Sequence, residues 1–166
     1  MFMLAKTFSR EDPTGWWMSE KFDGYRAMWT GAEFVSREGN TFPAPVSWIS
    51  ALPSVALDGE LWLGRGRFNG MAHAVRCTDW SELSFMIHDM PHHPGMFEER
   101  QAALADMSLP AFCRKITQTR CDGSEFLDGY FKSIKDNGGE GVMLRAAGSR
   151  YEPWRSRSLL KKKIAQ

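Results

Sequence analysis

The sequence has few cysteines, no long apolar run and almost no net charge. Its three cysteines, Cys77, Cys113 and Cys121, are widely spaced and form no CxxC pair, so neither a zinc site nor a disulfide framework is indicated. His92 and His93 lie between prolines, which favours a polar turn over a metal site. No apolar stretch approaches membrane-spanning length, and the N-terminus does not resemble a signal peptide. We expect a soluble protein that makes no membrane contact, cytoplasmic unless an export signal has been removed.

The composition is that of a folded globular protein. The 166 residues are 43% hydrophobic and 25% charged, which predicts one domain spanning residues 1–166. A net charge of only +1 gives no global signature of nucleic-acid binding. Any basic surface must therefore be local. The best candidate is the run at residues 150–163, for which a solvated tail is the alternative.

Hydrophobic periodicity predicts an α+β fold without internal repeats. Residues 25–29 and 34–35, separated by the Thr30-Gly31 turn, indicate a β-hairpin. Apolar residues at helical spacing indicate a helix over residues 96–107 and another over residues 126–134, which Asn137-Gly138-Gly139 ends. Further strands are predicted over residues 58–63, 83–87, 142–145 and 159–164.

The segment KFDGYR at residues 21–26 places a lysine, an aspartate and an arginine around a glycine. A fixed pattern of these four residue types arises by chance with a probability of about one in a thousand, so alone it is only suggestive, and an exposed turn is the alternative. Gly24 would let the backbone turn sharply and bring Lys21 and Arg26 to one pocket. The guanidinium fork of Arg26 suits phosphate or ribose oxygens.

A nucleophilic lysine needs help to lose its proton. An ordinary lysine, with a pKa near 10.4, is neutral less than about one time in a thousand at pH 7. Lys161 and Lys163 alternate along a predicted strand and so share a face, where they could disfavour the charge on Lys21 and bind phosphate. Lys162 would face the other way. Asp23 could hydrogen-bond to Lys21 or join a metal site through water.

Glu60 and Glu140 each stand beside glycine at the mouth of an apolar strand. Transfer of a nucleotidyl group requires neutralisation of phosphate charge, and carboxylates that hold Mg²⁺ are a common means. The alternative for each glutamate is an ordinary exposed residue. We expect a Mg²⁺ or Mn²⁺ site that includes Glu140 and Glu60.

Five segments in order, together with residues 85–90, resemble the motif series of the covalent nucleotidyltransferases, specifically the adenylation domain of ATP-dependent DNA ligases. They cover almost the whole chain and are similar to the small bacterial E-type ligases and their phage relatives. The implied fold is an antiparallel-sheet, ATP-grasp-like nucleotidyltransferase domain with flanking helices and no OB-fold domain. The five segments are KFDGYR at 21–26, SREG at 36–39, DGEL at 58–61, EGVMLR at 140–145 and LLKKK at 159–163.

The resemblance implies that Lys21 attacks ATP to form a lysyl-AMP adduct. It also implies that the AMP then passes to the 5′-phosphate of nicked double-stranded DNA and that the nick is sealed. The enzyme is expected to be a monomer. Lys21, Asp23, Glu140, Lys161 and Lys163 would form the catalytic set. The implied nucleotide-binding residues are Ser19, Glu20, Lys21, Arg26, Arg37, Glu60, His88, Lys161 and Lys163, and the implied DNA-binding residues are Arg37, Arg155 and Lys162.

The chain departs from the family pattern at three places. His88 stands where the family has a phenylalanine or tyrosine that stacks on adenine, and an imidazole can also stack. Trp154 replaces a usual glycine before Arg155. The sequence ends at Gln166, just after the last motif, where such ligases normally continue into an OB-fold domain. The alternatives are an RNA ligase, a GTP-dependent capping guanylyltransferase, or a degenerate DNA-binding module.

Overall fold

The computed structural model describes residues 1–165, and their contacts divide the chain into two compact units. Unit 1 comprises Met1–Phe22, Met96–Glu98 and Ile116–Gln166, and unit 2 comprises Asp23–Gly95 and Glu99–Lys115. The chain first passes from unit 1 to unit 2 directly after Lys21-Phe22. Within residues 1–165, no helix has both the length and the apolar character needed to cross a membrane.

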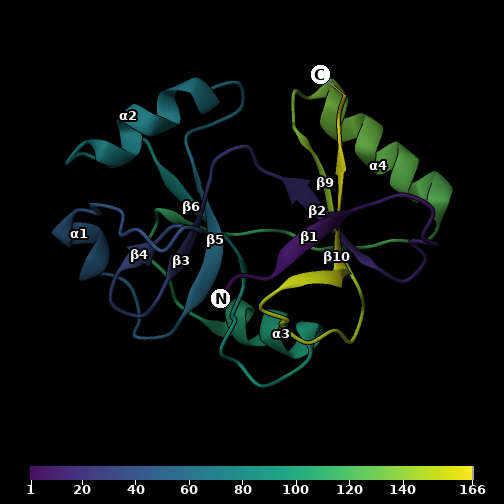
Figure 1. Ribbon diagram of the computed structural model, residues 1–166, viewed down its shortest axis with the longest axis horizontal. Coiled ribbons are helices and arrows are strands. Elements are labelled where there is room, and N and C mark those ends of the chain that lie inside the picture. The colour runs from purple at the N-terminus through teal and green to yellow at the C-terminus, as the bar shows by residue number, and fades with distance from the viewer. Residues whose placement is uncertain (166) are drawn as a thin grey trace. The chain divides into compact units, whose positions relative to one another are not determined.

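Unit 1 is built on a five-stranded sheet with one long helix on one face (Figure 1). Only the β1–β10 pair is parallel. Met18, Leu144 and Leu160 point from the sheet into a core shared with Leu127 and Ile134 of α4, which covers that face. The strand order is β1 (Leu4–Thr7), β10 (Arg155–Lys163), β9 (Gly141–Arg145), β2 (Trp17–Lys21) and β8 (Thr119–Arg120), and the helix is α4 (Ser124–Asp136).

Helix α4 forms and ends as its sequence predicts. Leu127, Tyr130, Phe131 and Ile134 lie at helical spacing and pack on the sheet, whereas Phe126 is exposed. After Asn137, the left-handed backbone of Gly138 (φ +80°) lets Gly138 and Gly139 donate to the carbonyls of Lys135 and Ile134. This glycine cap returns the chain to the sheet at the start of β9.

Unit 2 contains the second five-stranded sheet and most of the shorter helices (Figure 1). All its neighbouring strands are antiparallel except β6 and β7. Helix α3 (Phe97–Asp106) begins in unit 1 and continues in unit 2. The strand order is β4 (Phe34–Val35), β3 (Tyr25–Trp29), β5 (Leu57–Trp62), β6 (Ser84–Asp89) and β7 (Cys113–Lys115), and the other helices are α1 (Val46–Ile49), the 3₁₀ turn η1 (Phe68–Gly70) and α2 (Met71–Arg76).

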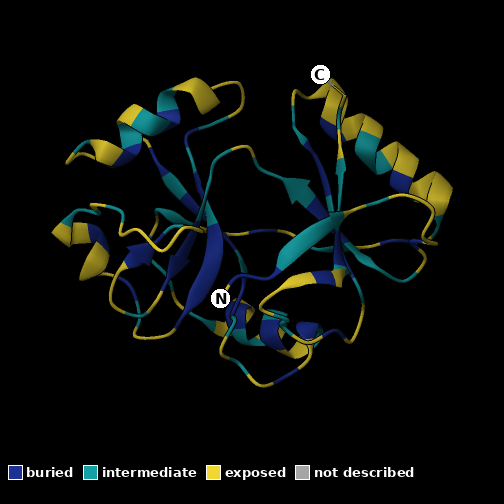
Figure 2. Cartoon of the chain, viewed as in Figure 1, coloured by how far each residue is buried: buried dark blue, intermediate teal, exposed yellow. Residues whose placement is uncertain are grey.

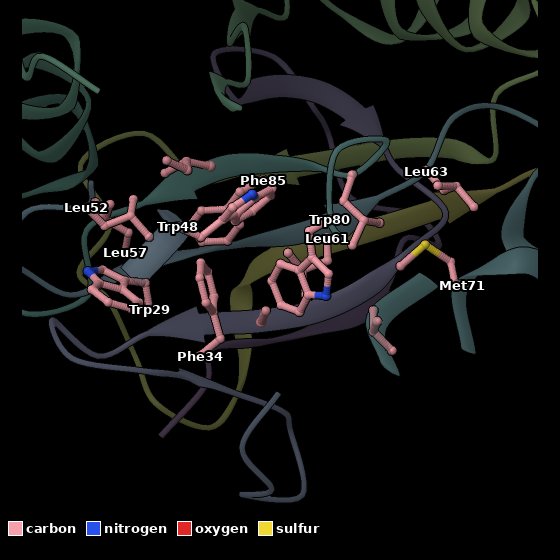
Figure 3. Packing of buried hydrophobic residues seen from close by; sticks show 14 of the residues in the cluster. Trp29, Phe34, Trp48, Leu52, Leu57, Leu61, Leu63, Met71, Trp80 and Phe85 are labelled. Carbon is pink, nitrogen blue, oxygen red and sulfur yellow. The ribbon is translucent and has the colours of Figure 1, made fainter. Parts of the chain in front are cut away.

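Aromatic side chains dominate the core of unit 2 (Figure 3). Phe34 lies at the centre, with ring centroids 5.0 Å from Phe85, 5.1 Å from Trp29 and 5.8 Å from Trp80. These separations and the tilted or edge-on orientations suit aromatic packing. Because Trp29, Phe85 and Leu61 come from one face of the sheet, the opposite face carries the intervening side chains.

The predicted α+β class and the predominantly antiparallel sheets are confirmed, as is the hairpin after Lys21. Its turn forms because Gly31 takes a left-handed backbone (φ +100°) and the Thr30 hydroxyl accepts from the amides of Ala32 and Glu33. Both sheets are open along residues 1–165, with no strand closing either into a barrel.

Several elements were not predicted. They are β1, β2, β7, β8, α1, α2 and the 3₁₀ turn η1, and β10 begins at Arg155 instead of residue 159. Strands β7 and β8 are too short to show a period, and the start of β10 alternates exposed arginines with serines, so it lacks the apolar signal of a half-buried strand. Figure 2 shows this exposed start of β10 beside its buried centre.

Candidate active site

The register of three strands in unit 1 places Glu140 between two lysines. Gly141 of β9 pairs with Lys21 of β2 on one side and with Lys163 of β10 on the other. Glu140 immediately precedes Gly141, and its Oε1 accepts a hydrogen bond from Lys21 Nζ at 2.8 Å while Lys163 Nζ lies 3.4 Å away. Lys21 thus joins Glu140, which lies 119 positions later in the sequence, and Lys163 in one charged cluster.

Glu140 has an oxygen that the protein leaves available. Its Oε2 is buried and has no hydrogen-bond partner among residues 1–165, which is costly for a carboxylate oxygen unless a further group binds there. Gly141 allows this arrangement, because a Cβ at this position would lie 2.2 Å from the carbonyl oxygen of Lys162. Any larger residue would push β9 away from β10 and separate Glu140 from Lys163.

Strand alternation sorts the predicted residues of unit 1 onto two faces. Lys21 and Ser19 lie opposite Met18, which faces α4. On β10, Lys163 reaches Glu140, whereas Lys162 turns to the α4 side, with its Nζ 3.2 Å from Asp128 and 4.7 Å from the Phe131 ring centroid. The expectation that Lys162 faces away from Lys161 and Lys163 is confirmed.

Glu20 also lies on the α4 side of the sheet. A Cβ on Gly139 would come within 2.9 Å of Glu20 Oε1. Burial, together with the Glu20 carboxylate, raises the pKa of Tyr130 on α4. Glu20 therefore does not share the face of Lys21, and its part in nucleotide binding stays a prediction.

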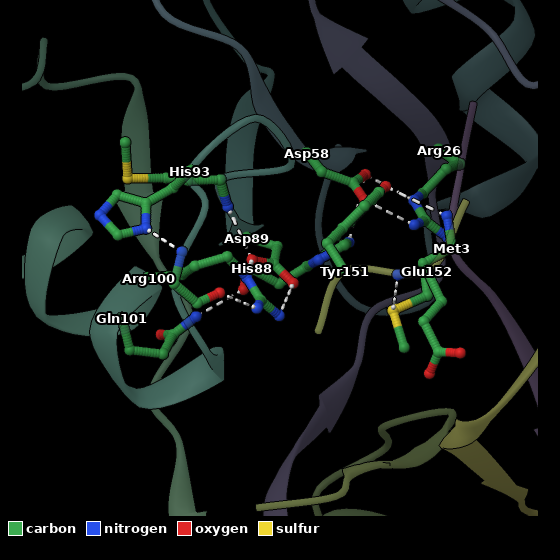
Figure 4. Close-up of polar contacts among 12 residues, drawn as sticks. Met3, Arg26, Asp58, His88, Asp89, His93, Arg100, Gln101, Tyr151 and Glu152 are labelled. Atoms are coloured by element: carbon green, nitrogen blue, oxygen red, sulfur yellow. Dashed lines mark hydrogen bonds and ion pairs between the residues drawn. The ribbon is translucent and has the colours of Figure 1, made fainter. Parts of the chain in front are cut away.

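In unit 2, Arg26 is held by a buried carboxylate that was not among the predicted site residues. Its Nε and Nη2 each donate to Asp58 at 2.7 Å, a two-pronged ion pair in which Asp58 is fully buried (Figure 4). Such a pair fixes the plane of the guanidinium. The signal in the sequence is an aspartate between Leu57 and Gly59 inside an apolar strand, where a charge requires a partner.

Three predicted nucleotide-binding residues share the face of the unit 2 sheet opposite the aromatic core. Arg26 pairs directly with Glu60 across β3 and β5. A bulge between Asp58 and Gly59 changes the register with β6, and His88 Nε2 lies 3.6 Å from Asp58 Oδ1. Asp58 thus stands between the arginine and the imidazole.

Side chains of α3 hydrogen-bond to the end of β6 that carries His88 (Figure 4). Arg100 and Asp89 form an ion pair with both side chains fully buried, at 2.7 Å between Nε and Oδ1. Arg100 Nη1 also donates to the carbonyl of Gly95, and Gln101 Nε2 donates to the carbonyl of His88. These bonds hold the backbone on either side of the imidazole.

Gly24 serves a different purpose from the one predicted. It does not take a left-handed backbone. Instead, a Cβ here would lie 2.0 Å from the carbonyl oxygen of Leu61, so the glycine permits close approach of the chain to β5. Close approach, rather than an unusual turn, explains why no side chain fits at this position.

A second polar cluster in unit 1 was missed because its members are distant in sequence. Glu98 accepts from the Trp17 indole at 3.0 Å and from the amide of Gly148, and the Arg120 guanidinium lies 4.8 Å from the Trp17 ring centroid. Burial opposes ionisation of Glu98, but these hydrogen bonds outweigh it, and the pKa of Glu98 is lowered. The cluster holds the first residue of β2, Trp17, at the end of the strand opposite Lys21.

The remaining predicted residues are exposed. Asp23 and Arg37 lie in loops, and Arg155 stands at the start of β10. No group of three or more His, Cys, Asp or Glu side chains in the described part of the chain is arranged to hold a metal ion. A metal would therefore take only one or two carboxylates here and complete its shell with water and phosphate oxygens, as Mg²⁺ commonly does.

The sheets that carry the lysine–glutamate–lysine cluster and the arginine–aspartate pair match the nucleotidyltransferase domains of DNA ligases. No protein-family model matches the chain. It is 31% identical over 170 residues to a DNA ligase of Haemophilus influenzae, covering 99% of this chain and 63% of that protein. Its structure matches a Lig E DNA ligase with a TM-score of 0.91 and 30% identity, covering 98% of this chain and 68% of that one.

The fold also matches the Chlorella virus DNA ligase-adenylate, with a TM-score of 0.80 and 20% identity over 98% of this chain and 66% of that one. The chain belongs to the ATP-dependent DNA ligase family and corresponds to its adenylation domain. It spans less than two thirds of the length of the Haemophilus ligase.

Proposed function

We propose that the chain catalyses covalent adenylyl transfer from ATP and, through it, the sealing of nicked double-stranded DNA. The observation that carries the proposal is the contact of Lys21 Nζ with Glu140 Oε1 at 2.8 Å beside Lys163. A nucleophile, a carboxylate and a second cation on one face are the groups that attack on a phosphate requires. Membership of the ligase family supports the assignment.

In the first step, the lone pair of Lys21 Nζ attacks the α-phosphorus of ATP. A P–N bond forms, the bond to the bridging oxygen breaks, and pyrophosphate leaves with that electron pair. The amine must also lose its protons, and Glu140 Oε1 lies within hydrogen-bond distance to receive one. Lys163 and Lys161 supply positive charge for the phosphate oxygens on which negative charge accumulates.

The residues present fit a divalent cation. The buried, unpartnered Oε2 of Glu140 is a hard oxygen ligand of the type that Mg²⁺ and Mn²⁺ prefer, and Glu60 and Asp23 are further candidates. A bound ion would neutralise phosphate charge during transfer. Glu140 would then serve both the ion and Lys21, through different oxygens.

Arg26, Glu60 and His88 would bind the nucleoside. Arg26 and Glu60 are cross-strand neighbours that offer a donor and an acceptor for ribose hydroxyls. Asp58 would keep Arg26 in one orientation, so the arginine does not have to be ordered when ATP binds. His88 would stack on adenine, and a nucleotide contact of Ser19 stays a prediction.

In the later steps, an oxygen of the DNA 5′-phosphate attacks the phosphorus of lysyl-AMP, the P–N bond breaks and Lys21 is released. The 3′-hydroxyl then attacks the 5′-phosphorus, loses its proton and displaces AMP. The new phosphodiester bond joins the strand. Arg37, Arg155 and Lys162 are the proposed DNA contacts.

The test separates nucleotide choice from strand joining. The chain is incubated with Mg²⁺ and either α-labelled ATP or GTP, and the denatured protein is examined for label. An adenylate supports the proposal, whereas a guanylate would indicate capping chemistry. A nicked duplex carrying a preformed 5′-adenylate then tests the last step alone, and sealing of RNA in preference to DNA would contradict the assigned substrate.

A further inference from the structure

The largest exposed aromatic side chain in the described part of the chain is Trp154, which is 57% exposed. It lies in unit 1, between Pro153 and the first residue of β10. Trp29, Trp48 and Trp80 are buried in the core of unit 2, whereas Trp154 is exposed. An indole left in water forgoes a large burial free energy, and tryptophan is enriched where a protein surface meets a partner.

The backbone that carries Trp154 is fixed on both sides. The amide of Trp154 donates to the carbonyl of Glu152 at 2.7 Å, and its own carbonyl accepts from the amide of Leu4 in β1 at 2.9 Å. Two residues after Trp154, Ser156 is buried and donates from Oγ to the Glu152 carboxylate at 2.9 Å. The indole therefore projects from a backbone segment that is fixed at the entry to β10, and not from a loose tail.

Arginines accompany the indole. Arg155 and Arg157 flank buried Ser156, and both are exposed. Arg155 Nη1 donates to the carbonyl of Ala5 at 2.7 Å, which anchors the guanidinium and uses one of its five donors. Arg150 adds a third exposed positive charge to this segment, whose single acid is Glu152.

We propose that Trp154, Arg155 and Arg157 form a DNA-contacting surface that binds one strand of the nicked duplex. Residues two apart on a strand are separated by about 7 Å, which is comparable to the spacing of successive phosphates along one strand of DNA. The two guanidinium groups would bind neighbouring phosphates, and the indole would pack against the adjoining sugar and base edge. Arginine beside an aromatic is a combination suited to nucleic acid.

This inference rests on the proposed function, and it adds a residue that the ligase motif series does not supply. The family resemblance places glycine at the position of Trp154, so the aromatic contact would be particular to this chain. The indole would give binding energy that does not depend on salt, whereas the arginines would give the salt-dependent part. These two contributions can be measured separately.

The test uses fluorescence anisotropy of a labelled nicked duplex titrated with the full chain without ATP. We expect Trp154→Ala to weaken binding about tenfold, since base–aromatic contacts are typically worth this much or more, and Trp154→Phe to restore most of it. Phe126→Ala, which removes another exposed aromatic from α4, is the matched control and should bind as wild type. Arg157→Ala should lower the slope of log Kd against log salt by about one, and Trp154→Ala should not change it.

Wild-type affinity in Trp154→Ala, or an equal loss in Phe126→Ala, would overturn the proposal. Tighter binding of an unbroken single strand than of the nicked duplex would overturn the assignment to duplex DNA. Adduct formation from ATP by the wild-type chain is measured without DNA, so a missing adduct contradicts the proposed function, while the Trp154 variants decide the DNA surface.

Discussion

Replacement of Asp58 by asparagine tests whether the pair with Arg26 orders the nucleotide-binding face of unit 2. Asp58 is fully buried, while the Arg26 side chain is 16% exposed. Loss of one partner from a buried ion pair typically costs about 3–5 kcal/mol. Asparagine can still accept one of the two hydrogen bonds, and water reaches part of the guanidinium, so we expect a loss of about 2–3 kcal/mol.

The assay is urea unfolding followed by tryptophan fluorescence, to which Trp29, Trp48 and Trp80 of the unit 2 core contribute. In a thermal scan the same loss lowers Tm by about 5–10 °C for a chain of this length. Asp106→Asn, at an exposed position, is the matched control and should change stability by less than about 0.5 kcal/mol. The reasoning is refuted if Asp58→Asn is as stable as the control.

Three further predictions concern single side chains. Glu140→Gln should slow adduct formation more than about hundredfold, since it removes a metal-binding charge. Glu125→Gln on α4 is the control. If the rate of adduct formation in Glu140→Gln depends on Mg²⁺ as in wild type, Glu140 does not bind the metal. His88→Phe should bind ATP as tightly as wild type or more tightly in calorimetry, because phenylalanine keeps the stacking surface; a loss of affinity above about tenfold would refute stacking. Burial raises the pKa of Cys113 to about 12, so at pH 9 only about one thiol in a thousand is ionised, and iodoacetamide should label it rapidly only as the pH approaches that value. Fast labelling at pH 9, located by peptide mapping, would contradict the buried environment.

The sequence predicted the elements whose signal is local. The hairpin of β3 and β4 and the helix α4 were found because apolar periodicity, a turn and a glycine stop occur within a few residues. Strand β2 was missed, although it carries Lys21. One face of β2 packs into the core through Met18, and the other carries the polar residues Ser19 and Lys21. In so short a strand this pattern gives only a weak alternation of apolar and polar residues.

The family motifs implied the candidate residues and the catalytic set they form, but the contacts within that set could not be read from the sequence. Glu140 meets Lys21 and Lys163 only because β9 lies between β2 and β10 in a register centred on Gly141. Pairing between β2 and β9, which are far apart in the sequence, is not encoded in any local pattern. The bond between Arg26 and Asp58 was missed for the same reason, although a charge inside an apolar strand was a usable signal.

The central claim is that Lys21 is the nucleophile that carries AMP. The measurement is mass spectrometry of the intact chain, then of its peptides, after incubation with ATP and Mg²⁺, for wild type, Lys21→Ala and the control Lys135→Ala on α4. The account predicts a single AMP adduct, located on Lys21, in wild type and the control and none in Lys21→Ala. An adduct on another residue, or one that persists in Lys21→Ala, would contradict it.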